Sequence, residues 1–162
     1  MMYQEALAWL EELGRFGIQL GLQRMERLAE RLGNPERRYR TVHVTGTNGK
    51  GSVSAMMAAA LTRCGISTGL YTSPHLVSYT ERMCIDDRAI SEADFARTLT
   101  CVRQAVEDMV AAGEESPTQF EVLTAQAFLW FAEQGAEYAV VEVGLGGLLD
   151  STNILLRSEE RR

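Results

Sequence analysis

A seven-residue segment, Gly-Thr-Asn-Gly-Lys-Gly-Ser at residues 46–52, constrains this sequence more than any other feature. It contains Lys50, the single lysine among the 16 cationic side chains of the chain. A β-branched run at 41–45 predicts a buried strand before it, and apolar residues at helical spacing follow from Val53 to Cys64. Strand, glycine loop and helix in this order are typical of phosphate-binding loops, where backbone N–H groups converge on an anion at the positive end of a helix.

The side chains of the loop fit the same chemistry. Lys50 is the expected catalytic residue, because its ammonium can neutralise β- and γ-phosphate oxygens, and Ser52 can offer its hydroxyl to Mg²⁺. The spacing departs from G-x-x-x-x-G-K-[ST], since Gly51 separates lysine from serine, and an ordinary glycine-rich turn is the alternative interpretation. The expected phosphate-binding residues are Thr47, Asn48, Gly49, Lys50, Gly51 and Ser52.

Apolar periodicity along the rest of the chain predicts an α/β fold. We expect two helices in the first 35 residues, and further buried strands at 66–71 and 138–143. Later helices should open at Ser91 with Asp94 and at Ser116, Pro117 and Gln119, with a hairpin turn at 86–87 between the second strand and these helices. Strands alternating with helices imply a P-loop-containing three-layer αβα architecture with a mainly parallel sheet.

This pattern divides the sequence into three regions. Residues 1–40 are expected to form an N-terminal helical segment, 41–156 a partial central ATP-binding domain, and 157–162 a charged tail. Ligands of such sheets bind at the carboxyl ends of the strands, so the residues that follow each strand are the candidates for chemistry.

Two residues at strand ends are candidate metal ligands together with Ser52. Glu142 ends an apolar strand, where burying an unpaired carboxylate is costly unless a cation is bound, and a solvated strand end is the alternative. Ser73 follows the second strand and should project toward the same edge of the sheet, although a serine before proline is also an ordinary turn former. His43, inside the first strand, is expected to be a core histidine without a role.

An irregular segment follows Pro74 and carries His75, Tyr79 and Arg82. A segment of this length without periodicity is either functional or mobile. Substrate contact is therefore one of two open interpretations for these three side chains.

Charge and cysteine content restrict the partners. A net charge of −6 argues against a broad nucleic-acid footprint, and the longest apolar run is far shorter than a membrane span. Cys64, Cys84 and Cys101 lack the close pairing of a zinc or redox motif. We therefore expect a cytoplasmic protein with small-molecule substrates and without nucleic-acid or membrane partners.

Three ordered motifs together carry a family resemblance. They are Thr-Gly-Thr-Asn-Gly-Lys-Gly-Ser at 45–52, Gly-Leu-Tyr-Thr-Ser-Pro-His-Leu-Val-Ser-Tyr-Thr-Glu-Arg at 69–82, and Glu-Val-Gly-Leu-Gly-Gly at 142–147 continuing to Asn153. In this order the sequence resembles the folylpolyglutamate synthases, including the bifunctional forms with dihydrofolate synthase activity, within the Mur ligase superfamily.

The resemblance implies an ATP-dependent, Mg²⁺-assisted ligase that adds L-glutamate to a folate or dihydropteroate carboxylate through an acyl phosphate. By the same resemblance, residues 47–52 cradle the ATP phosphates, Ser73 and Glu142 help to hold magnesium, and the loop from His75 to Arg82 borders the folate pocket. The parent enzyme is expected to be a monomer.

Two departures from the family qualify this interpretation. Leu148 stands where relatives most often have a basic residue. The chain also ends where relatives continue with further strands and a C-terminal domain. We therefore expect it to be the inactive N-terminal part of a longer enzyme, with a truncated Mur-ligase-type ATPase domain. The alternatives are a non-catalytic nucleotide-binding module and another Mur-type amide ligase.

Overall fold

The computed structural model describes residues 1–14, 21–144, 146 and 149–155. Within these residues a five-stranded sheet has the order β1-β5-β2-β3-β4. Strand β5 pairs in parallel with both β1 and β2, whereas β3 and β4 extend the sheet in antiparallel fashion. The strands are β1 (Arg40–Val44), β2 (Thr68–Tyr71), β3 (Met83–Ile85), β4 (Arg88–Ala89) and β5 (Tyr138–Glu142).

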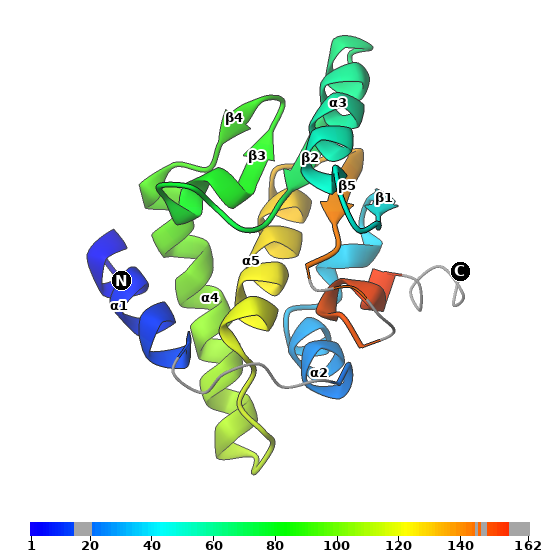
Figure 1. The fold of residues 1–162 in the computed structure, drawn as a ribbon. Helices are drawn as coiled ribbons and strands as arrows, with labels where there is room; N and C mark the ends of the chain where they lie inside the picture. The colour runs from blue at the N-terminus through cyan, green and yellow to red at the C-terminus, as the bar shows by residue number, and fades with distance from the viewer. Residues whose placement is uncertain (15–20, 145, 147–148, 156–162) are drawn as a thin grey trace.

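Helices cover both faces of the parallel strands (Figure 1). Helix α3 lies on one face, where it contacts β1, β2 and β5. Helix α5 lies on the other face and is itself covered by the remaining helices. The helices are α1 (Tyr3–Gly14), α2 (Gln23–Arg31), α3 (Lys50–Arg63), α4 (Glu92–Ala111) and α5 (Gln119–Glu133), with 3-10 turns η1 (Pro35–Arg37), η2 (Tyr79–Arg82) and η3 (Ser151–Asn153).

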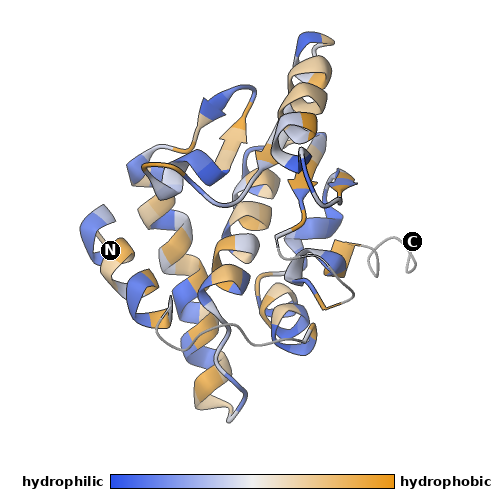
Figure 2. Cartoon of the chain, viewed as in Figure 1, coloured by the Kyte–Doolittle hydropathy of each residue, from blue (hydrophilic) through white to orange (hydrophobic). Residues whose placement is uncertain are grey.

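The core follows from the alternation of side chains along the strands. On β5, Val140 packs toward α3 in a small cluster with Val44 and Ala58, whereas Ala139 and Val141 enter the main core beneath α5. Figure 2 shows the middle of strand β5 coloured as hydrophobic. The central strand β5 is thus buried on both faces, as a crossover-connected sheet requires, whereas only Val44 of β1 is buried.

The predicted α/β fold with a mainly parallel sheet between helices is confirmed. Element boundaries differ by a few residues: the strand expected at 41–45 occupies Arg40–Val44, and the strand expected at 66–71 begins at Thr68. Helix α3 begins at Lys50 rather than at Val53, because the last loop residues form its first turn after Gly49 in the left-handed region.

The expected helix openings are partly right. At α4, the Ser91 hydroxyl accepts a hydrogen bond from the Asp94 N–H at 3.0 Å, as predicted. At α5, the prediction of Ser116-Pro117 is wrong: the cap is Thr118, whose hydroxyl accepts from the Glu121 N–H at 3.2 Å while Glu121 accepts from the Thr118 N–H at 2.7 Å. This reciprocal pair of bonds satisfies two helix-end donors, which explains the later start.

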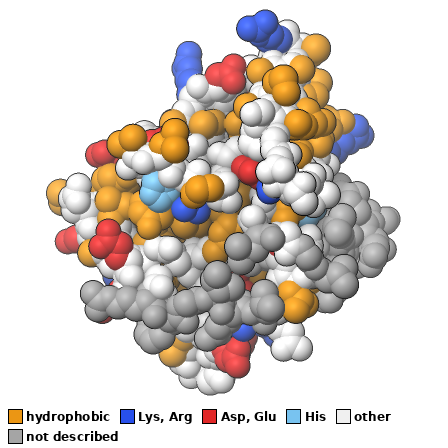
Figure 3. Space-filling view, in the orientation of Figure 1, with side chains coloured by type: hydrophobic (Ala, Val, Ile, Leu, Met, Phe, Trp, Pro, Cys, Tyr) orange, Lys and Arg blue, Asp and Glu red, His pale blue; other side chains and the backbone are white. Residues whose placement is uncertain are grey.

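Helical periodicity alone did not show which side of α3 is buried. Ser54 and Ala58 are its buried residues, whereas Val53, Met56 and Met57 are exposed. Figure 3 shows these hydrophobic side chains as an orange area along α3. The expected charged tail at 157–162 and Leu148 lie outside the described residues.

Candidate functional site

The glycine loop joins the end of β1 to the start of α3, as the sequence predicts. Gly46 and Gly49 have φ values of 152° and 74°, which L side chains rarely adopt, so glycine is required at both positions. Residues 45–49 are exposed, and the Lys50 ammonium donates to the Gly46 carbonyl oxygen at 2.9 Å. The exposed backbone of the loop is therefore available to an anion, and the lysine side chain curls back over it.

Glu142 lies directly beside this loop. A Cβ built on Gly51 would lie 3.7 Å from one carboxylate oxygen of Glu142 and 3.8 Å from the other. Glu142 is only 6% exposed, and its Oε2 accepts a hydrogen bond from the Ser73 N–H at 3.2 Å. Because β1, β5 and β2 are adjacent and parallel, their carboxyl ends bring together the loop, Glu142 and Ser73.

The donor set around Glu142 suits Mg²⁺ better than a transition metal. Among the described residues, no group of three His, Cys, Asp or Glu side chains could hold a metal, and Glu142 forms no ion pair. Mg²⁺ is usually bound by one or two carboxylates, with substrate phosphates and water as the remaining ligands. Gly51, the residue before Ser52, lies beside the Glu142 carboxylate, and the Ser73 backbone N–H donates to it. Both serines therefore belong to chain segments next to Glu142, so the residues present fit such an ion.

A second group of side chains lies in the segment after Pro74. The Arg82 Nε donates to the His75 Nδ1 at 2.9 Å, the His75 and Tyr79 ring centroids are 4.3 Å apart, and the Arg82 guanidinium lies 5.4 Å from the centre of the Tyr79 ring. The three predicted substrate residues thus contact one another. Because Nδ1 accepts the hydrogen bond from Arg82, the neutral ring of His75 carries its hydrogen on Nε2. Burial and the Arg82 charge both lower the His75 pKa.

The backbone of this segment is held by a carboxylate. Glu81 accepts hydrogen bonds from the N–H groups of Leu76 at 3.0 Å, Val77 at 3.0 Å and Ser78 at 2.8 Å. These backbone bonds lower the pKa of Glu81. Leu76 and Val77 are 94% and 89% exposed although their backbone is fixed, so the segment presents two aliphatic side chains to solvent.

The sequence analysis missed residues from other elements that support this group. Gln119 at the start of α5 donates to the Tyr79 hydroxyl at 3.0 Å and to the Leu10 carbonyl at 2.9 Å. Tyr71, at the end of β2, is fully buried, its hydroxyl lies 3.2 Å from the Thr124 hydroxyl on α5, and burial raises its pKa to about 12. No local pattern could have revealed either contact, because both join residues far apart in the chain.

His43 is not the core histidine that the sequence led us to expect. It is half-buried, and its Nε2 lies 2.7 Å from the Thr152 hydroxyl. Burial lowers the His43 pKa, and the Asp150 charge opposes this effect.

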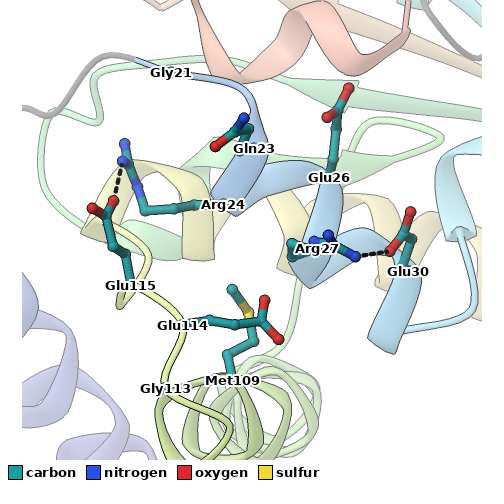
Figure 4. Close-up of a pocket in the computed structure, with 10 residues that line it drawn as sticks. All are labelled: Gly21, Gln23, Arg24, Glu26, Arg27, Glu30, Met109, Gly113, Glu114 and Glu115. Atoms are coloured by element: carbon teal, nitrogen blue, oxygen red, sulfur yellow. Dashed lines mark hydrogen bonds and ion pairs between the residues drawn. The ribbon is translucent and has the colours of Figure 1, made fainter.

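A separate cavity of about 750 Å³ lies between α2 and the end of α4 (Figure 4). None of the predicted site residues lines it. Its charged side chains include the Arg24–Glu115 and Arg27–Glu30 ion pairs, which Figure 4 marks with dashed lines. The cavity is therefore not part of the site at the strand ends.

Within the described residues, the helices are all too short or too polar to cross a membrane. Cys64, Cys84 and Cys101 are free thiols.

Comparison with known proteins reveals close similarity to one group of enzymes. A dihydrofolate synthase/folylpolyglutamate synthase of Bacillus subtilis is 39% identical over 154 residues, which are 94% of this chain and 36% of that protein. A folylpolyglutamate synthase of Lacticaseibacillus casei is 37% identical over 156 residues, covering 96% of this chain and 36% of the relative. No protein-family model matches the chain.

Solved structures agree. A folylpolyglutamate synthase from Thermotoga maritima has a TM-score of 0.87 at 41% identity and covers 94% of this chain and 35% of its own. An FPGS–AMPPCP–folate complex has a TM-score of 0.87 at 37% identity, with 95% of this chain and 38% of that chain covered. In sequence and in fold, these 162 residues are therefore homologous to the folylpolyglutamate and dihydrofolate synthases, over about one third of the length of those proteins.

Proposed function

We propose that this chain supplies the phosphate-binding half of an ATP-dependent ligase, which joins L-glutamate to the carboxylate of a folate or dihydropteroate. In this reaction the carboxylate attacks the γ-phosphorus of ATP and releases ADP. The glutamate amine then attacks the resulting acyl phosphate, forming an amide and releasing phosphate. The homology to folylpolyglutamate and dihydrofolate synthases supports the reaction class.

The observation that carries the proposal is the proximity of the glycine loop to Glu142. A Cβ on Gly51 would lie 3.7 Å from the buried carboxylate, so the loop that would bind phosphate and the acid that would bind a divalent ion are in direct proximity. An ordinary glycine turn would not need a buried acid at this point, because an unpaired buried carboxylate is costly. The geometry therefore favours the phosphate-binding interpretation of the loop over the ordinary turn.

Each residue of the site has a distinct role in this proposal. The N–H groups of residues 47–52 bind phosphate oxygens, and the Lys50 ammonium leaves the Gly46 carbonyl to neutralise charge that develops on the transferred phosphoryl group. Glu142 would hold Mg²⁺ together with the hydroxyls of Ser52 and Ser73. When bound, this ion neutralises phosphate charge.

The second group suits the organic substrate. Tyr79 offers a ring face, His75 offers a second ring in contact with it, and the Arg82 guanidinium lies above Tyr79. A flat aromatic ring system with an attached carboxylate matches such a combination of stacking surface and cation. The folate named in the FPGS–AMPPCP–folate complex has this chemistry, which supports the assignment of residues 75–82 to the folate side of the site.

We further infer that the enzyme acts in the cytoplasm as a monomer without nucleic-acid partners. The free thiols of the three cysteines fit a reducing compartment.

Calorimetric titration of the chain with ATP in the presence of Mg²⁺ tests the proposal. We expect saturable binding that Lys50→Ala weakens by tenfold or more, because a hydrogen bond between the Lys50 ammonium and a charged phosphate oxygen is worth roughly 1.5–3 kcal/mol. Arg63→Ala, at the exposed far end of α3, is the matched control and should bind as the wild type does. Absence of binding in the wild type, or equal affinity in Lys50→Ala, would contradict the proposal.

A further inference from the structure

We propose that His43 is a positioning residue that fastens the segment 149–153 to the strand from which the phosphate loop emerges. Its hydrogen bond with Thr152 joins residues 109 positions apart. The bonding pattern stands on geometry alone, whereas its effect on nucleotide affinity rests on the proposed function.

The segment after β5 is attached to β1 at both of its ends. Where it begins, the Val143 N–H donates to the Val44 carbonyl at 2.9 Å. Where it ends, the Thr152 side chain meets His43, the neighbour of Val44 on the same strand. The described residues Val143 and Thr152 therefore contact neighbouring positions of β1, Val44 and His43.

The position of His43 explains why this attachment concerns the site. His43 lies three residues before Gly46 and pairs in register with Val141, the residue before Glu142. A bond from Thr152 to His43 thus fixes the segment 149–153 relative to the two strands that carry the phosphate loop and the acidic residue. Loss of this bond would leave this segment attached only through its remaining contacts.

The direction of the bond follows from counting protons. The Thr152 hydroxyl has one hydrogen, which it donates to the Asp150 Oδ1 at 2.6 Å, and the Thr152 N–H donates to the same oxygen at 3.0 Å. An ionised carboxylate only accepts, so the hydroxyl can meet His43 only as an acceptor. The His43 Nε2 must therefore carry a hydrogen and donate it.

Burial makes this arrangement specific. Thr152 is fully buried and Asp150 is 6% exposed, so water cannot readily replace a lost partner. Asp150 also caps the turn η3, because its side chain accepts from the Thr152 N–H. His43, Thr152 and Asp150 together form a continuous chain of hydrogen bonds from β1 to the cap of η3.

Three variants of the full 162-residue chain test the assignment: His43→Ala, Thr152→Val and the double variant. We expect each to speed exchange of the Asn153 amide, which donates to the Asp150 carbonyl, and to weaken Mg²⁺·ATP binding by about threefold to tenfold, the range of one neutral hydrogen bond. Thr152→Val also removes the hydroxyl bond to Asp150, so the double variant should equal Thr152→Val, because both substitutions remove the bond between His43 and Thr152. His43→Gln, which keeps a donor near the Nε2 position, should recover most of the wild-type behaviour.

The nitrogen chemical shifts of His43 distinguish a histidine that donates a hydrogen bond from Nε2 from one that only fills space. We expect the Nε2 resonance of a protonated nitrogen in the wild type and a changed shift in Thr152→Val. An unprotonated Nε2, additive effects of the two single variants, or failure of His43→Gln to restore slow exchange would overturn the inference. If the wild type does not bind ATP, the proposed function fails, while the chemical shift and the exchange rates still decide the role of His43.

Discussion

The buried ion pair between α2 and α5 gives the sharpest stability prediction. Glu121 is 1% exposed and accepts from the Arg24 Nε at 3.2 Å and from the Arg24 Nη2 at 3.2 Å, and it also accepts from the Thr118 N–H at 2.7 Å. Glu121→Gln removes the charge but keeps a side chain that can complete a capping box. The amide then turns an N–H₂ group toward the guanidinium and leaves an Arg24 donor without its acceptor.

The magnitude follows from this geometry. Removing one partner of a buried pair costs about 3–5 kcal/mol, and the lower end applies because Arg24 keeps its second ion pair with Glu115. We therefore expect the free energy of unfolding to fall by about 3 kcal/mol. For a chain of this length each kcal/mol lowers the melting temperature by about 2–4 °C, so the melting temperature should fall by about 6–12 °C.

Urea denaturation followed by circular dichroism measures this change, and α2 itself supplies the control. Arg27 and Glu30 form a second ion pair on α2, drawn in Figure 4, but their side chains are 64% and 53% exposed. Glu30→Gln should change the free energy of unfolding by less than about 0.5 kcal/mol. If Glu121→Gln and Glu30→Gln shifted the urea midpoint equally, the argument from burial would be refuted.

Two further predictions concern the packing behind the sheet and the segment after Pro74. Gly69→Ala should lower the free energy of unfolding by about 1–3 kcal/mol in urea titration, because the added Cβ would lie 2.8 Å from ring carbons of Phe131. Phe131→Leu should recover part of this loss. An unchanged urea midpoint in Gly69→Ala would contradict this packing. The pKa of Glu81 is lowered in the folded protein, so its hydrogen bonds to the backbone of the segment should be fully formed above the ordinary pKa of 4.5. They should be lost as the pH falls through the lower pKa of the folded state. Glu81→Gln should remove this acid-dependent change in the exchange of the Val77 and Ser78 amides, and a segment equally protected in both proteins at every pH would refute the assignment.

Local sequence patterns predicted the elements at the strand ends well. The strand at 138–142 is an apolar run that ends in a carboxylate, and the loop at 46–52 contains three glycines and the single lysine of the chain. The rules of parallel sheets put the carboxyl ends of such strands at one edge, so Glu142 and the glycine loop could be assigned to that edge. The direct pairing of β1 with β5 was not predicted.

Contacts between distant residues could not be predicted in this way. Thr152 meets His43 across 109 positions, and nothing in the sequence near either residue marks the pair. The start of α5 was misassigned for a different reason, because Pro117 is itself a favourable first helical residue and competes with the Thr118 cap. Such choices between neighbouring signals depend on which hydrogen bonds the folded chain can complete.

The most direct test of the account is the effect of Mg²⁺ on ATP affinity in the wild type and in Glu142→Gln. If Glu142 and the glycine loop form one metal and phosphate site, Mg²⁺ should raise the affinity of the wild type for ATP and have little effect in Glu142→Gln. Glu107→Gln, which changes a half-exposed acid on α4, should respond to Mg²⁺ as the wild type does. An equal response to Mg²⁺ in Glu142→Gln and the wild type would contradict the central claim.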